Sequence, residues 1–91
     1  MSATIRIPSM LRALCSGSTT VAVEAETVGR ALDELECLHP GFSERLFDTD
    51  GRLRRHVNVF VDDEDIRHLG GLATALPRDT TITIIPAIAG G

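Results

Sequence analysis

The sequence predicts a single α+β domain in which a mixed sheet of four to five strands is covered on one face by one main helix. Short segments of alternating apolar and polar residues occur near both ends and in the second half of the chain, which is the pattern of half-buried strands. One segment between them places apolar residues at helical spacing. The chain has 91 residues, enough for one hydrophobic core but not for two.

The first half of the chain predicts a β-hairpin followed by the helix. Residues 3–7 alternate and end at Pro8, and residues 19–24 alternate again after a loop over residues 11–18, so the two segments can pair. Thr27 is a suitable N-cap for a helix that runs to about Leu38. A His-Pro-Gly run then stops the helix, because proline lacks the amide donor. The apolar stripe of this helix comprises Val28, Ala31, Leu32, Leu35 and Leu38.

The second half predicts three further strands separated by turns. A polar connection over residues 42–55 leads to a strand at 57–61, and the acidic run 62–65 indicates a turn. Residues 66–68 are expected to form a short edge strand, and residues 81–85 a last strand that ends at a proline. This element order on so short a chain is typical of the β-grasp, or ubiquitin-like, fold. One face of the sheet would pack on the helix and the other would be open to solvent.

The bulk composition argues against several classes of partner. The formal net charge is −4, so nothing indicates binding to nucleic acid or to an anionic membrane. The N-terminal residues contain no apolar core of signal-peptide length, and no stretch approaches the ~20 apolar residues of a membrane helix. We therefore expect a cytoplasmic protein.

The sequence shows no pattern for a bound metal or cofactor. Cys15 and Cys37 lack the spacing of metal ligands and are expected to be free thiols without a role, with Cys37 exposed opposite the apolar stripe of the helix. The three histidines are scattered over a helix end, a strand and a loop. The acidic run 62–65 lacks the alternating ligands and the glycine of a calcium loop.

The C-terminal residues carry the candidate chemistry. We divide the chain into a folded domain, residues 1–86, and an extended tail, residues 87–91. Ile88, Ala89 and Gly90 would thread into the active site of a partner enzyme, since two terminal glycines make an end without side chains. The carboxylate of Gly91 is the candidate reactive group. A carboxylate is a poor electrophile, so it would first need activation, for example adenylation with ATP.

A docking surface for that partner is expected beside the tail. Phe60 alternates with the core valines of its strand, so it should lie on the open face of the sheet together with Ile85, close to Pro86. Asp62 and Asp63 could complement a basic surface on the same partner. The alternative is that these acids form only a solvated turn, and that the two apolar residues are incidental.

Several segments resemble a known family. Residues 82–91 resemble the C-terminus of the MoaD/ThiS sulfur-carrier family, and residues 57–67 resemble its central strand and acidic turn. Residues 43–48, 70–76 and 5–8 resemble, more closely, the CysO-like carriers of actinobacteria. The likeness covers nearly the whole chain and includes the terminal Gly-Gly.

The resemblance implies a cycle in which the chain is a protein cosubstrate rather than an enzyme. As a carrier it is expected to be monomeric when free and to bind its partners transiently. An adenylating enzyme of the MoeB/ThiF type would activate Gly91 with ATP, and a sulfur donor would convert the adenylate to a thiocarboxylate. In the CysO-like branch the acceptor is an activated serine on a pyridoxal-phosphate-dependent synthase, and a zinc-dependent peptidase releases the cysteine product. Three alternatives stay open: the small subunit of a molybdopterin synthase, a ubiquitin-like modifier of protein lysines, and an interaction domain whose Gly-Gly is inert.

Overall fold

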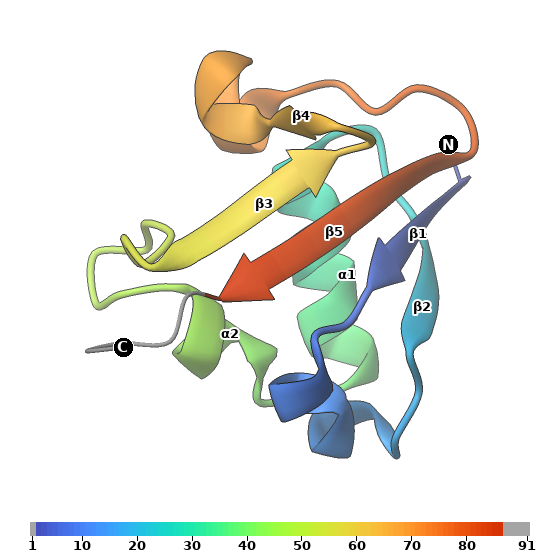
Figure 1. The fold of residues 1–91 in the computed structure, drawn as a ribbon, viewed down its shortest axis with the longest axis vertical. Coiled ribbons are helices and arrows are strands. Elements are labelled where there is room, and N and C mark those ends of the chain that lie inside the picture. Colours follow the sequence, from blue (N-terminus) through green and yellow to red (C-terminus); the bar gives the residue numbers. More distant parts are fainter. Residues whose placement is uncertain (1, 87–91) are drawn as a thin grey trace.

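A computed structural model describes residues 2–86 and confirms the predicted β-grasp fold (Figure 1). Five strands form one mixed sheet in the order β2-β1-β5-β3-β4, and helix α1 packs on one face of it. The strands are β1 (Ser2–Arg6), β2 (Thr20–Glu24), β3 (Val57–Val61), β4 (Glu64–Asp65) and β5 (Thr80–Pro86). The helices are α1 (Val28–Leu38) and α2 (Phe42–Leu46), and the 3-10 turns are η1 (Ser9–Cys15), η2 (Ile66–His68) and η3 (Gly71–Ala73).

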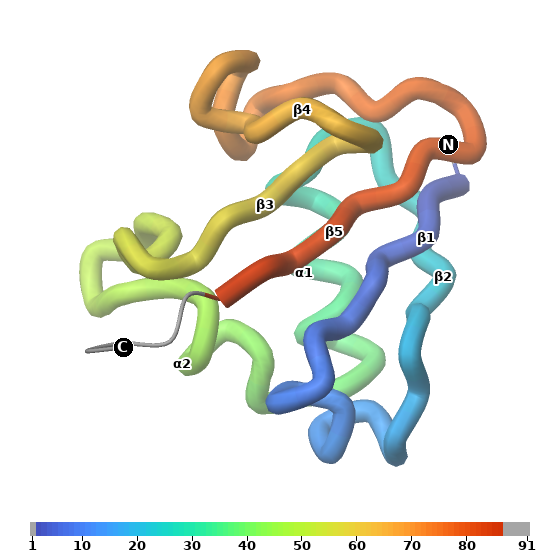
Figure 2. The backbone as a smooth tube through the Cα atoms, in the orientation of Figure 1, coloured from blue at the N-terminus to red at the C-terminus, as the bar shows by residue number. Residues whose placement is uncertain are grey.

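Strand β5 is the centre of the sheet, with β1 parallel on one side and β3 antiparallel on the other, as the chain path in Figure 2 shows. Ile82 lies opposite Ile5 of β1, and Ile84 lies opposite Val59 of β3. Residues in register share a face of a sheet, and all four of these side chains are buried on the face that packs against α1. The predicted stripes therefore do form the core against α1.

Helix α1 begins as the sequence predicts. The Thr27 side chain accepts a hydrogen bond from the backbone N–H of Arg30 (3.2 Å), which satisfies one of the free donors of the first turn. The first four residues of the predicted stripe are buried, but Leu38 is 49% exposed, so the prediction for Leu38 is wrong. Leu38 is the last helical residue, and the neighbouring short helix α2 instead places Phe42 in the core, where it is fully buried.

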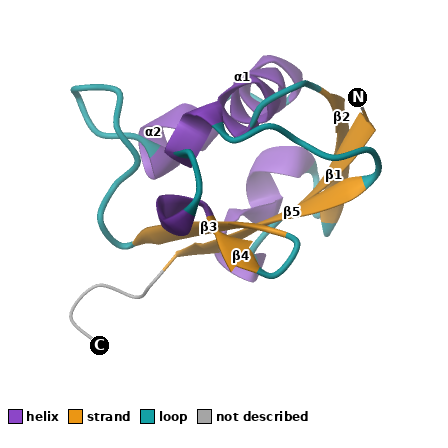
Figure 3. Ribbon diagram, turned by 90° about the horizontal axis from the view of Figure 1, so that it is seen from above, coloured by secondary structure: helices purple, strands orange, loops and turns teal. Residues whose placement is uncertain are grey.

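Helix α2 lies inside the segment expected to be an irregular connection. The carboxylate of Glu36 accepts hydrogen bonds from the backbone N–H groups of Gly41 (3.1 and 3.2 Å) and Ser43 (2.7 Å), and these bonds tie the end of α1 to the start of α2. Gly41 has φ 118°, in the left-handed region that favours glycine. As a result α1 and α2 lie on the same side of the sheet (Figure 3).

Two local expectations are wrong in the second half. The edge strand is β4, at Glu64–Asp65, and residues 66–68 form the turn η2 instead, because the Asp65 side chain accepts from the N–H of Arg67 (2.8 Å) and caps that turn. The segment 11–18, expected as a loop, begins with most of the 3-10 turn η1. No helix in the range 2–86 is long and apolar enough to cross a membrane.

Candidate functional site at the end of the last strand

Strand β5 ends at Pro86, which the structure keeps in the sheet opposite Val57. The N–H of Val57 donates to the carbonyl of Arg54 (2.9 Å), and the carbonyl of Val57 accepts from the Arg67 guanidinium (2.9 Å). Both backbone groups of Val57 therefore point away from β5, so no hydrogen bond between the strands is lost where proline lacks its N–H. The sequence-based expectation that the ladder stops before Pro86 is wrong by this one residue.

Phe60 and Ile85 lie together on the open face of the sheet. In the β3–β5 register Phe60 is opposite Thr83, and Ile85 is opposite Asn58, so the two apolar side chains are diagonal neighbours on adjacent strands. Ile85 is 47% exposed and Phe60 is half-buried. The structure thus brings together Phe60 and Ile85, two of the apolar residues of the predicted docking surface. Pro86, the third, follows Ile85 in β5 but shares the helix-side face of its register partner Val57.

A groove that the sequence did not reveal adjoins these residues. It has a volume of about 630 Å³ and lies where β1 and β5 end and where η1 begins. Its apolar lining includes Met10, which is 57% exposed, and its basic lining includes two arginines. The lining residues are Arg6, Ile7, Pro8, Ser9, Met10, Arg12, Thr19, Thr20, Thr83, Ile84, Ile85 and Pro86. Arg6 alternates with the buried Ile5, so its side chain is on the open face of the sheet. Only the pairing of β1 with β5, which the sequence did not predict, brings Arg6 to this site.

The acidic turn lies away from this site. Asp62 has φ 54°, its N–H donates to the carbonyl of Thr81 (2.8 Å), and its carboxylate accepts from the N–H of Thr81 (3.1 Å). These bonds close the connection at the start of β5, whereas Ile85 and Pro86 are at its end. Asp63 is exposed in the same turn. The structure therefore does not bring Asp62 and Asp63 to the apolar part of the docking surface, and Asp62 has a structural role that the sequence did not indicate.

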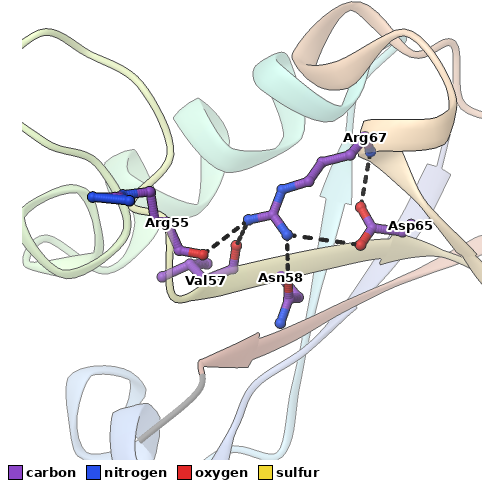
Figure 4. A network of polar contacts seen from close by, with 5 residues as sticks. All are labelled: Arg55, Val57, Asn58, Asp65 and Arg67. Carbon is purple, nitrogen blue, oxygen red and sulfur yellow. Dashed lines mark hydrogen bonds and ion pairs between the residues drawn. The ribbon is translucent and has the colours of Figure 1, made fainter. Parts of the chain in front are cut away.

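Arg67 fixes the outer edge of β3 close to the end of β5 (Figure 4). Its guanidinium donates to the carbonyls of Arg55 (3.1 Å) and Val57 (2.9 Å) and to the side-chain oxygen of Asn58, and it lies 3.9 Å from the Asp65 carboxylate. Strand β4 pairs only with the far end of β3. Arg67 therefore takes the place of a neighbouring strand along the first half of β3.

The remaining candidate groups are the two cysteines, possible metal ligands and the C-terminal residues. Cys37 is exposed, as predicted, and Cys15 is buried, with its thiol donating to the carbonyls of Arg12 (3.5 Å) and Ser18 (3.4 Å). Among residues 2–86 there is no group of three or more His, Cys, Asp or Glu side chains that could hold a metal ion. Ile88, Ala89, Gly90 and Gly91 lie outside the described residues.

The sequence model of the ThiS family matches residues 5–91, which is nearly the whole chain and includes the terminal Gly-Gly. The chain belongs to the ThiS family. Among the proteins to which the chain is similar, the sulfur carrier protein CysO of Mycobacterium tuberculosis is 44% identical over the full length of both chains. Small archaeal modifier protein 3 of Haloferax volcanii is 40% identical over 71% of this chain and 70% of its own.

Solved structures agree with this ThiS-family assignment. CysO in the crystal structure of the Amycolatopsis orientalis BexX/CysO complex is 39% identical, covers 98% of this chain and 99% of its own, and superposes with a TM-score of 0.90. The crystal structure of Mycobacterium tuberculosis CysO is 42% identical over 94% of this chain and 99% of its own, with a TM-score of 0.89.

Proposed function

We propose that this protein is a sulfur carrier, a cosubstrate that delivers sulfur from a thiocarboxylate on Gly91 and performs no catalysis itself. The observation that carries the proposal is the end-to-end match with proteins named as sulfur carriers, since the matched residues run to the terminal glycine.

The chemistry begins with activation of the terminal carboxylate. The carboxylate oxygen of Gly91 attacks the α-phosphorus of ATP in an adenylating enzyme of the MoeB/ThiF type, and pyrophosphate leaves. Hydrosulfide from the sulfur donor then attacks the carbonyl carbon of the adenylate; a C–S bond forms, the C–O bond to AMP breaks, and loss of the S–H proton leaves the thiocarboxylate. Glycine suits this carbonyl because it has no side chain to hinder the attack. ATP is thus a substrate of the partner and is not bound by the carrier.

The open sheet face is the proposed docking surface for the adenylating enzyme. Phe60 and Ile85 place apolar surface on this face close to Pro86, where the chain leaves β5, so a partner that covers them holds the last five residues near its own active site. Fully extended, five residues reach about 17 Å. In Amycolatopsis orientalis, CysO is found in a complex with BexX, which shows that a carrier of this kind binds a partner protein.

The sulfur acceptor is proposed to be a biosynthetic intermediate held by a separate synthase. The similarity to CysO favours cysteine biosynthesis, with a pyridoxal-phosphate-dependent synthase as the acceptor enzyme and a zinc-dependent peptidase to release the product. A synthase that makes another sulfur-containing metabolite is the alternative acceptor.

The test is intact-mass spectrometry after incubation with a MoeB/ThiF-type enzyme, ATP and a sulfide source. The expected result is a mass gain equal to the exchange of one oxygen for one sulfur. Deletion of Gly91 should abolish the gain, whereas Arg78→Gln, a substitution of an exposed residue at the other end of β5, should leave it unchanged. Absence of the gain in the wild-type chain at saturating enzyme would refute the carrier function.

The similarity to small archaeal modifier protein 3 supports a second candidate, a modifier joined through Gly91 to lysines of other proteins. The chain has nine basic residues and all are arginine, so chains linked through its own lysines cannot form. Higher-mass adducts that persist under reducing and denaturing conditions, and that disappear on deletion of Gly91, would support this candidate. The candidate fails if no such adduct forms in cells that contain the activating enzyme.

A further inference from the structure

Three arginines surround the end of β5. Arg6 is the last residue of β1 and lies opposite Thr83 of β5, and Arg12 lines the same groove as Arg6 and Pro86. Arg55 lies on the other side, two residues before Val57, the partner of Pro86. We call Arg6, Arg12 and Arg55 the exit arginines.

The charges of the exit arginines are available to a partner. Within residues 2–86 none of the three guanidinium groups forms an ion pair. Arg6 and Arg55 are exposed, and Figure 4 shows the side chain of Arg55 pointing away from the Arg67 network, to which it contributes only its carbonyl. Arg12 is half-buried, and its Nε donates to the carbonyl of Ile7 (3.1 Å), which holds the side chain along the groove.

The opposite end of the sheet is acidic. The turn with Asp62 and Asp63 precedes β4, and Asp79 comes just before β5, where its N–H donates to the carbonyl of Ser2 (3.0 Å). Glu24 lies opposite Ser2 at the same end. Although the net charge of the chain is −4, the end of the sheet from which the chain leaves β5 is therefore basic and the other end is acidic.

We propose that the exit arginines dock on an acidic rim around the active-site entrance of the adenylating enzyme and orient the carrier with its C-terminus first. This inference rests on the proposed sulfur-carrier function and names the chemistry of the partner surface: Asp and Glu side chains. A charge separation along the molecule favours encounters in which the basic end faces an acidic surface, and this raises the association rate. A protein partner is favoured over nucleic acid because a phosphate backbone running past the basic end would also meet the acidic turn.

The experiment compares two full-length variants in which exposed arginines become glutamate, so that the net charge changes from −4 to −8 in the first and from −4 to −6 in the second. In Arg6→Glu/Arg55→Glu both substituted side chains are exposed exit arginines, and in the control Arg78→Glu the exposed side chain is at the acidic end. Association with a MoeB/ThiF-type enzyme without ATP is followed by stopped flow at 20 mM and 500 mM NaCl, roughly the range over which the screening length falls from about 20 to 4 Å. Thermal unfolding of each variant checks that it is folded.

The double variant should associate at least about tenfold more slowly than wild type at low salt, and this difference should shrink at high salt. Arg78→Glu should stay within about twofold of wild type. The proposal is overturned if Arg78→Glu slows association as much as the double variant, if the wild-type rate is independent of salt, or if the exit arginines instead confer binding to a DNA duplex.

The conversion assay separates this inference from the proposed function. At saturating enzyme the double variant should still be converted to the thiocarboxylate, because the reacting carboxylate is unchanged. If every variant is converted normally and associates at the wild-type rate, the proposed contact of the exit arginines is refuted but the sulfur-carrier function is not. Failure of the wild-type chain to be converted would instead remove the proposed function on which the contact rests.

Discussion

Replacing Arg67 by methionine should loosen the outer edge of β3. Methionine keeps most of the aliphatic stem but removes the guanidinium, which donates three hydrogen bonds to Arg55, Val57 and Asn58. A hydrogen bond contributes about 0.5–1.5 kcal/mol net, and values near the lower end apply here because the Arg67 side chain is 48% exposed. The Asp65 carboxylate at 3.9 Å adds little to this sum. The expected loss in the free energy of unfolding is therefore about 1–2 kcal/mol.

Urea unfolding followed by far-UV circular dichroism measures this loss. With a slope near about 1 kcal/mol per molar urea for a small domain, the midpoint should fall by roughly 1–2 M. Arg67→Lys should lose nearly as much, because an ammonium group cannot reach three acceptors as the planar guanidinium does. Arg78→Met, at an exposed arginine without a hydrogen bond or ion pair in the range 2–86, is the matched control and should leave the midpoint unchanged. The reasoning is refuted if the lysine variant is as stable as wild type, since charge rather than hydrogen-bond geometry would then hold the edge.

Two neighbouring residues of β5 should behave in opposite ways. Ile84 is in the core, so Ile84→Ala should lower the free energy of unfolding by about 2–5 kcal/mol in urea titrations. Ile85 is exposed, so Ile85→Ala should lower that free energy far less and should instead weaken binding to the adenylating enzyme, as measured by calorimetry. Equal losses of stability in the two variants would contradict this. Hydrogen bonds from Ser43 and Gly41 lower the pKa of Glu36, so its stabilising effect is present above the ordinary carboxyl range and is lost as pH falls toward the lowered pKa. Glu36→Gln should therefore unfold at lower temperature at pH 7 and approach wild type at acidic pH in thermal scans, and a pH-independent difference would be the contrary result.

Patterns along the chain were sufficient to predict most of the fold. Alternation placed Ile5, Val59 and Ile82 on one face of the sheet, and helical spacing with Thr27 as the N-cap placed α1. These predictions succeed because a strand or helix must bury its apolar stripe, whatever its neighbours are. They fail at element ends such as Leu38, where burial depends on which segment covers the last turn.

The sequence by itself determined the fold class, the place of Phe60 and Ile85 on the open face of the sheet, and the choice of the Gly91 carboxylate as the candidate reactive group, because each depends on local periodicity or on a motif. Only the tertiary structure decided which distant residues meet. It placed Arg6 opposite Thr83 in the groove that Pro86 also lines, directed the Asp62 carboxylate to the N–H of Thr81, and set the Arg67 guanidinium along β3. The physical reason is that hydrogen bonds and charges act over a few ångströms in space. The strand order determines which residues come that close, and the spacing of residues along the chain does not determine the strand order.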